Sequence, residues 1–153
     1  MGEKNALESE ETNMATGTAL LFPWNDTFSV QIGIIDMQHK NLVSVVNELH
    51  QAMAAGQGKQ ELGRILSSLI KYTQVHFKTE ESFMESHRYP KYIVHKSEHE
   101  ELTKTVLDFQ SKFQEDEVGL TVEVMDFLKT WLSQHILGSD KKYTPFLNAK
   151  GVR

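Results

Sequence analysis

Hydrophobic residues recur at alternating steps of three and four along four long stretches of the chain, with polar residues between them. This spacing is typical of helices that pack with nearly aligned axes, because it keeps one apolar face of each helix turned toward its neighbours. We therefore predict four helices, at approximately residues 36–55, 59–86, 90–114 and 120–137. Asp36 is the expected N-cap of the first helix, which Gly56 and Gly58 end. Tyr89 and Pro90 mark a corner between the second and third helices, because proline restricts the residue before it.

Short connections between these stretches favour an all-α fold, an up-down-up-down antiparallel four-helix bundle. Residues 20–35 are apolar and aromatic without a helical period, so we expect an N-terminal arm in which Trp24 and Phe28 are packing anchors. A short helical segment is expected after the fourth helix, at the C-terminal end. Residues 1–19 are polar, acidic and aperiodic, which predicts a disordered tail before a single domain at residues 20–153.

The composition narrows the possible chemistry. The chain is 39% hydrophobic and 24% charged, which is ordinary for a globular domain. Its formal net charge is -5, and no basic cluster predicts binding to nucleic acid or to an anionic membrane surface. No apolar run is long enough to span a membrane. The absence of cysteine excludes disulfides, zinc–thiolate sites and iron–sulfur clusters, and is compatible with a cytoplasmic location. Any bound metal must therefore be held by nitrogen and oxygen.

Five of the seven histidines lie on the predicted apolar faces, and they are His39, His76, His95, His99 and His135. Those on the first and third helices come early, whereas those on the second and fourth come late. In an antiparallel bundle these positions share one end, so we expect the five side chains in one buried layer. Glu80 follows His76 by four residues and joins the same face. The other two histidines, His50 and His87, fall off the apolar faces and are expected in solvent.

A buried layer of this kind predicts a metal site. A single core histidine needs only one hydrogen bond, but five imidazoles and a carboxylate cannot all satisfy one another. Burying them without partners would cost several kcal/mol, which disfavours a metal-free bundle. Metal ions satisfy imidazole nitrogens and carboxylate oxygens together.

Spacing alone does not decide the role of Asp140. It follows His135 by five residues, which on a regular helix turns it roughly 140° away from the site. Gly138 can end or loosen the helix, and a wide turn there would bring the carboxylate back. From its position alone, Asp140 fits a metal ligand, a solvent-facing residue or the cap of a following YTPF segment equally well.

With these residues in view, the sequence closely resembles the hemerythrin family, and within it the single-domain bacterial members. The matching motifs are the PW pair, GIIDMQHKNLV, HFKTEE, HRYP followed by HKSEHEEL, and WLSQHILGSDKKY. The resemblance covers about residues 21–147. All seven family ligand positions hold the expected residue type, in the expected order and at the expected spacing, while the acidic tail lies outside the resemblance.

The resemblance implies a cofactor of two iron ions, Fe2+ or Fe3+, joined by an oxo or hydroxo bridge. It assigns His95, His99 and His135 to one ion, His39 and His76 to the other, and Glu80 and Asp140 to both as bridges. Together with the single-atom bridge, these ligands leave one position open on two six-coordinate ions, at the ion with two histidines. An open position is where an exogenous ligand binds, and in this family the ligand is dioxygen.

Leu42, Trp131, Leu132 and Leu137 lie a turn or less from the ligands and resemble the apolar wall of the family's oxygen pocket. They are also ordinary bundle core, and the two roles are compatible because the same side chains can fill the core and exclude water. A wall without acids or bases disfavours cleavage of the oxygen–oxygen bond. Tyr143 resembles an aromatic residue of the family near the site, and we expect it to close the end of the site.

The resemblance therefore implies reversible dioxygen binding for storage, delivery or buffering, with no enzymatic activity. The protein is expected to be a monomer that is served by a reductase or an oxygen-consuming partner. Two alternatives stay open: an oxygen or iron sensor that acts through a separate partner, and a di-iron enzyme with slow oxidase, peroxide or nitric oxide activity. A ferritin-like enzyme in its usual form is disfavoured, because the sequence contains no Glu-x-x-His.

Overall fold

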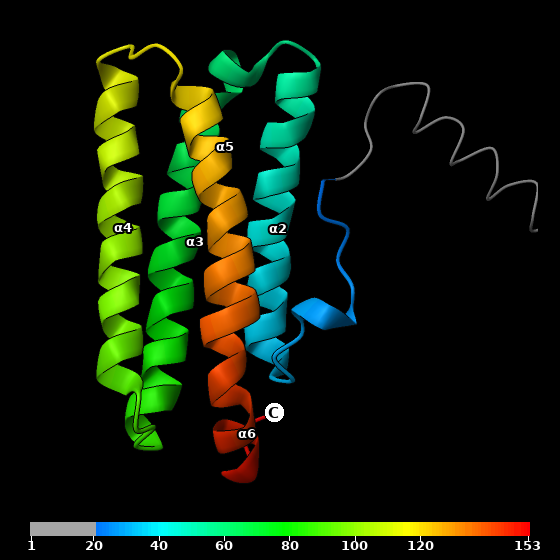
Figure 1. Cartoon of the computed structure of the whole chain (residues 1–153), viewed down its shortest axis with the longest axis vertical. Helices are drawn as coiled ribbons and strands as arrows, with labels where there is room; N and C mark the ends of the chain where they lie inside the picture. The colour runs from blue at the N-terminus through cyan, green and yellow to red at the C-terminus, as the bar shows by residue number, and fades with distance from the viewer. Residues whose placement is uncertain (1–20) are drawn as a thin grey trace, which may run out of the picture.

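Four long helices stand side by side and alternate in direction (Figure 1). They are α2 (Gly33–Ala54), α3 (Gly58–Ser86), α4 (Tyr92–Gln114) and α5 (Leu120–Thr130), and α5 continues through η2 (Trp131–Asp140) into α6 (Lys141–Ala149). This computed structural model describes residues 21–153, so the tail predicted over residues 1–19 lies outside the described residues. The prediction of an all-α, up-down-up-down bundle with a short C-terminal helix is confirmed.

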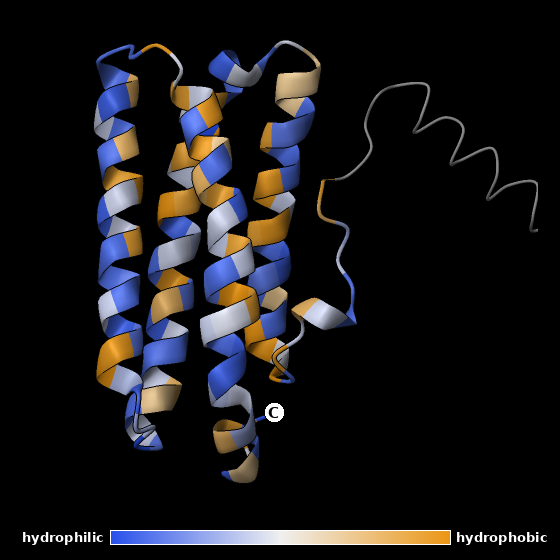
Figure 2. Ribbon diagram, viewed as in Figure 1, coloured by the Kyte–Doolittle hydropathy of each residue, from blue (hydrophilic) through white to orange (hydrophobic). Residues whose placement is uncertain are grey.

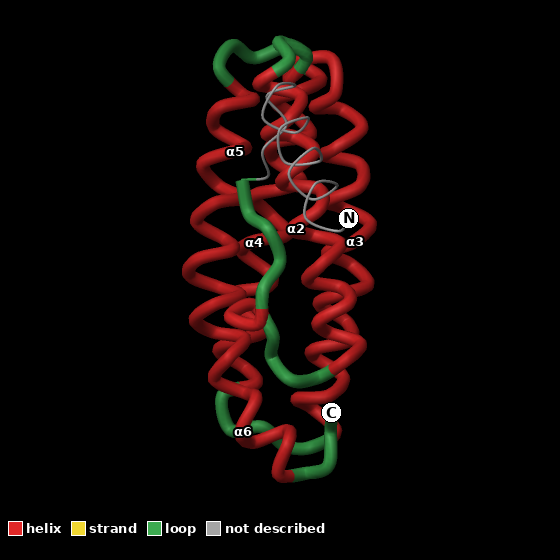
Figure 3. The backbone as a smooth tube through the Cα atoms, turned by 90° about the vertical axis from the view of Figure 1, so that its right-hand side faces the viewer, coloured by secondary structure: helices red, strands yellow, loops and turns green. Residues whose placement is uncertain are grey.

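An arm before α2 runs along the body of the bundle (Figure 3) and includes the short helix η1 (Asp26–Phe28). Phe28 is buried, and its ring stacks on that of half-buried Trp24 with the centroids 5.4 Å apart. Asn47 of α2 holds the start of the arm. Its side-chain amide donates to the carbonyl of Phe22 and accepts from the Phe22 N–H, both at 2.9 Å. The arm therefore packs as the sequence predicted, with the same two aromatic anchors.

The first helix begins earlier than predicted. Its first residue is Gly33 and its N-cap is Ile32, so the assignment of Asp36 as N-cap is wrong. The Asp36 carboxylate instead accepts hydrogen bonds from the Val30 N–H at 2.8 Å and the Ser29 hydroxyl at 2.6 Å. Asp36 thus binds the arm to the first turn of α2. As in an N-cap, its carboxylate accepts a backbone N–H, but that N–H belongs to the arm and not to the helix.

Two other boundaries differ from the prediction. The corner between α3 and α4 is longer, because Pro90 lies in the turn and α4 begins at Tyr92. Arg88 in this turn has φ 57°, the left-handed conformation that reverses the chain. The fourth helix does not end near Leu137 but continues without a break to Ala149.

The inward faces of the helices are apolar along most of their length (Figure 2) and form two clusters. The larger cluster fills the bundle between α2, α3, α4 and α5. The smaller one closes the end near α6 and consists of Val30, Ile32, Ile35, Met84, Tyr89, Tyr143 and Leu147. Along α2, His39 lies between Ile35 of the smaller cluster and Leu42 of the larger one. Along the bundle, the polar layer therefore lies between two apolar clusters.

Among the helices of residues 21–153, none has both the length and the apolar character that crossing a membrane requires.

Candidate metal centre

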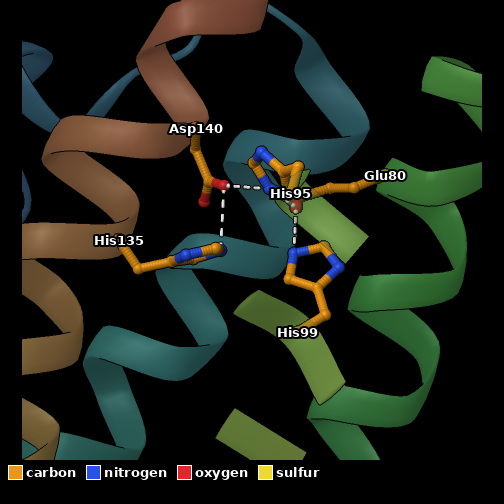
Figure 4. A group of neighbouring side chains, drawn as sticks. All are labelled: Glu80, His95, His99, His135 and Asp140. Carbon is orange, nitrogen blue, oxygen red and sulfur yellow. Dashed lines mark hydrogen bonds and ion pairs between the residues drawn. The ribbon is translucent and has the colours of Figure 1, made fainter. Parts of the chain in front are cut away.

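The five histidines and Glu80, which the sequence placed on the apolar faces, meet in one layer with Asp140, whose role the spacing left open. His39, His76, Glu80, His95, His99, His135 and Asp140 are each at most 5% exposed. Figure 4 shows five of them, contributed by α3, α4 and η2, with their side chains turned toward one another. The structure therefore brings together residues that are up to 101 positions apart in the sequence.

The ligand atoms fall into two groups that share both acids. One group consists of His95, His99 and His135 with Glu80 and Asp140, and the other of His39 and His76 with the same two acids. Within each group, one nitrogen or oxygen atom from every residue lies within 4.8 Å of the others. Each group offers nitrogen and oxygen donors at a spacing that suits one metal ion.

The Glu80 carboxylate faces both groups, with one oxygen on each side. Oε1 lies 3.0 Å from His76 Nε2, and Oε2 lies 3.0 Å from His99 Nε2. The carboxylate therefore offers one oxygen to each group.

The Asp140 carboxylate is divided in the same way. Oδ2 lies 3.0 Å from His39 Nε2, whereas Oδ1 lies 2.9 Å from His95 Nε2 and 3.1 Å from His135 Nε2. The two acids therefore enter from different helices and face the same pair of positions.

Asp140 reaches the site because the helix that carries it is wide. Residues 131–140 form a π-helix, in which hydrogen bonds join residues five apart in place of four. Residues five apart are then brought toward the same face, so Asp140 lies over His135. This wide stretch begins before His135 and includes Gly138, where the sequence suggested that the helix could loosen.

A hydrogen-bond chain fixes the His76 ring. The Thr79 hydroxyl donates to the Val75 carbonyl, so its oxygen is free to accept from the Gln38 amide nitrogen at 3.1 Å. The Gln38 carbonyl oxygen then accepts from His76 Nδ1 at 2.9 Å. With its proton on Nδ1, the ring presents a bare lone pair at Nε2, on the side of the cluster.

Two further imidazoles have acidic partners on their outer edges. Glu98 Oε2 lies 2.9 Å from His135 Nδ1, and Glu81 Oε2 lies 3.2 Å from His99 Nδ1. A carboxylate only accepts, so both rings donate from Nδ1 and turn Nε2 inward as well. Sequence analysis missed Gln38, Glu81 and Glu98. Each is the immediate chain neighbour of a residue on the apolar face, but many other surface residues share that position, so no signal in the sequence singled them out.

Without a metal, the two acids favour the protonated, positively charged forms of His39 and His95. Burial lowers the pKa of His39, but hydrogen bonds and charges from Asp140 and Glu80 outweigh it and raise the pKa to about 9. The same balance raises the pKa of His95 to about 10. For the acids the effect of burial is reversed, because burial raises the pKa values of Glu80 and Asp140. The neighbouring histidines outweigh it and hold both pKa values below the usual range. The two buried carboxylates are therefore stabilised by positive charge placed between them.

Two buried ring nitrogens indicate that protons alone do not satisfy the cluster. Nε2 of His99 and Nε2 of His135 lack a hydrogen bond within the described residues, although each lies close to a carboxylate oxygen. His39 Nε2 and His76 Nε2 lie 3.0 Å apart. Inward lone pairs at this spacing are the arrangement that cations stabilise, so the residues present fit a pair of metal ions.

The residues predicted to form an apolar wall are not all alike. Leu42, Trp131 and Leu132 are buried in the larger cluster, whereas Leu137 is half-buried and belongs to neither cluster of the described residues. The Trp131 indole N–H is buried without a partner there, which adds a polar donor to the wall. Sequence analysis also missed Phe77, whose ring stacks on His99 with the centroids 3.9 Å apart.

The remaining predictions concern residues around the cluster. Tyr143 is buried and donates to Glu80 Oε1 at 2.9 Å, so it closes the end of the layer and orients one shared acid. Burial and the negative charges of Glu80 and Asp140 raise its pKa well above the usual range, which keeps it a donor. His50 and His87 lie outside both ligand groups and are half-buried, not fully in solvent. His87 Nδ1 lies 2.8 Å from the Phe83 carbonyl at the end of α3.

Comparison with known proteins gives a consistent result. Residues 30–147 match the family model described as the hemerythrin HHE cation binding domain. A bacteriohemerythrin of Methylococcus capsulatus is 38% identical over 122 residues, which are 80% of this chain and 92% of that protein. A bacteriohemerythrin of Stenotrophomonas maltophilia is 33% identical over 84% of this chain and 83% of that protein. A crystal structure of wild-type hemerythrin superposes with a TM-score of 0.74 at 37% identity and covers 83% of this chain and 98% of that one.

Proposed function

This chain belongs to the hemerythrin family, and from that premise we propose that it binds dioxygen reversibly at a non-haem centre of two iron ions. The proposed role is oxygen storage, delivery or buffering, without turnover of a substrate. Two bridged iron ions would supply the electrons and the open coordination position that dioxygen requires. Every other part of the function rests on side chains of this chain.

The asymmetry of the ligand cluster carries the proposal. One group has three histidines and the other has two, while Glu80 and Asp140 belong to both. Two ions with the same coordination number would then be saturated unequally, and the group of His39 and His76 has one protein ligand fewer. That group is where we propose that dioxygen binds.

Surrounding residues favour release of dioxygen over its consumption. Leu42, Leu132 and Phe77 are buried beside the layer and exclude water, which limits the supply of protons to bound oxygen. The Tyr143 hydroxyl donates a hydrogen bond to Glu80, so its proton is already engaged by that acid. The Trp131 N–H is the one donor of the wall that has no partner among the described residues, and we propose that it faces the oxygen pocket.

Metal analysis combined with absorption spectra, under air and after deoxygenation of the same sample, tests the function directly. We expect two iron ions per chain and a charge-transfer band that appears with oxygen and disappears without it. A colourless protein loaded with zinc would contradict the proposal, and so would catalytic consumption of oxygen.

A pair of histidine variants tests the assignment of the binding side. His76→Ala removes one of the two imidazoles of the smaller group and should abolish stable oxygenation, measured by the same band. His50→Ala, on the same bundle but outside both groups, is the matched control and should leave the spectrum unchanged. Normal oxygenation of His76→Ala would refute the assignment.

A further inference from the structure

Three ligand imidazoles are each held at their outer edge by a side chain from the preceding long helix of the bundle, where α5 and η2 count as one helix. Gln38 of α2 is the partner of His76 of α3, Glu81 of α3 that of His99 of α4, and Glu98 of α4 that of His135 of η2. Each partner is also the chain neighbour of a ligand on its own helix. One helix therefore supplies a ligand to the centre and, from the next position, a hydrogen bond to the ligand of the following helix.

The partners of the two groups differ in charge. Both acidic partners, Glu81 and Glu98, act on the group of three histidines. The smaller group has only the neutral amide of Gln38, since Nδ1 of His39 is buried without a partner in residues 21–153. A carboxylate that accepts from Nδ1 draws the proton toward itself and makes Nε2 a stronger donor to a metal, which an amide does far less.

We propose that the negative charges of Glu81 and Glu98, acting through His99 and His135, make the three-histidine group the tighter cation site and the one that favours the more highly charged ion. The inference rests on the proposed function, because it assumes that the two groups hold two ions. It goes further in making the two sites unequal through their surroundings and not only through their number of histidines.

Both acids can be changed without opening the bundle. Glu98 is 41% exposed and Glu81 is 21% exposed. They lie in separate surface grooves, one lined by Phe77, Glu81 and His99, and the other by Glu98, Trp131 and His135. Substitutions at these positions meet solvent and not the apolar clusters, so the variants should fold.

Titration of the metal-free protein with Co2+ tests the proposal without any oxygen chemistry. We expect Glu98→Gln and Glu81→Gln to weaken one of two bound Co2+ ions by about 10- to 100-fold, the usual effect of removing an outer partner of a metal-bound histidine. Gln38→Glu should instead tighten the other ion. Glu101→Gln removes a charge from the groove of Glu98 without touching an imidazole and should bind like the wild type.

Comparison of glutamine and alanine variants separates charge from position. The amide of Glu98→Gln can still accept from His135 Nδ1, whereas Glu98→Ala cannot. If charge decides, the two variants weaken Co2+ binding alike. With iron in place, Glu98→Gln should also raise the reduction potential, by about 59 mV for each tenfold loss of preference for the ferric ion.

Different failures have different meanings. Wild-type protein that does not bind two Co2+ ions would remove the proposed metal centre itself. Two Co2+ ions in every variant with unchanged affinities would overturn only the role of Glu81 and Glu98. Weak binding by Glu98→Ala alongside normal binding by Glu98→Gln would overturn the proposal too, because position and not charge would then set the affinity.

Discussion

The inward-facing residues at the two ends of α3 have the same spacing, but burial favours the residues at one end and disfavours those at the other. Toward its start the inward face consists of Leu62, Leu66 and Leu69, which are at most 1% exposed. Toward its end the same face presents His76 and Glu80, which are just as buried. Period decides which side chains are enclosed, whereas residue type decides whether enclosure is favourable by itself. The apolar part of the bundle is stabilised by its own burial, but the polar layer needs cations.

Removal of the metal ions should affect the polar layer most. If each ion is present at about 1,000 times its dissociation constant, it stabilises the folded chain by about 4 kcal/mol. Stripping the protein with a chelator should therefore lower the free energy of unfolding by about twice that amount, measured by urea denaturation with and without metal. Superimposable curves would mean that the layer is satisfied by protons alone.

A change in the apolar part should be independent of metal. Leu66→Ala leaves a cavity between the helices far from the ligands and should cost about 2–5 kcal/mol. We expect the same loss in the metal-free and metal-loaded proteins, with both ions still bound, from urea denaturation combined with metal analysis. A much larger loss in the loaded protein would show that the two regions are coupled.

Metal uptake should depend on pH because imidazolium cannot bind a cation. The pKa values of His39 and His95 are raised to about 9 and about 10, so at neutral pH both rings are positively charged imidazolium ions in the metal-free layer. Binding must displace these protons, so affinity should increase by about tenfold per pH unit for each proton until the pH reaches those values. Calorimetry of Co2+ binding in buffers of different ionisation enthalpy counts the protons released.

The prediction of proton release has a control variant and a result that would contradict it. The apolar variant Leu66→Ala keeps all the ligands and should release as many protons as the wild type. Affinity that does not change between pH 6 and pH 8 would mean that the metal-free imidazoles are already neutral.

The sequence predicted most of this layer because helical spacing is a local property. Steps of three and four put His95 and His99 on one face, and the antiparallel order of the helices brought them to the level of His76. Asp140 could not be placed in this way, because a π-helix changes the angle between residues five apart. Only the resemblance to a known family favoured it as a ligand.

Outer partners were missed for a different reason. Glu81 and Glu98 lie off the apolar faces, where spacing gives no reason to separate them from other surface acids. Their hydrogen bonds to His99 and His135 depend on how closely neighbouring helices approach. Such contacts follow from packing distances between helices, which the hydrophobic pattern does not contain.

The smallest predicted effect concerns the arm, which lies outside both parts of the bundle. Asp36→Asn replaces the carboxylate that accepts from Val30 and Ser29 and should destabilise the protein by about 1 kcal/mol, measured by urea denaturation. Asp126→Asn, at an exposed position of α5, is the control for loss of one charge. Metal stoichiometry should stay at two, because His39 is fixed by the helix and not by the arm. If Asp36→Asn also weakened metal binding, the arm would have to be counted as part of the polar layer. The cation-dependent region of the molecule would then extend beyond the helices of the bundle.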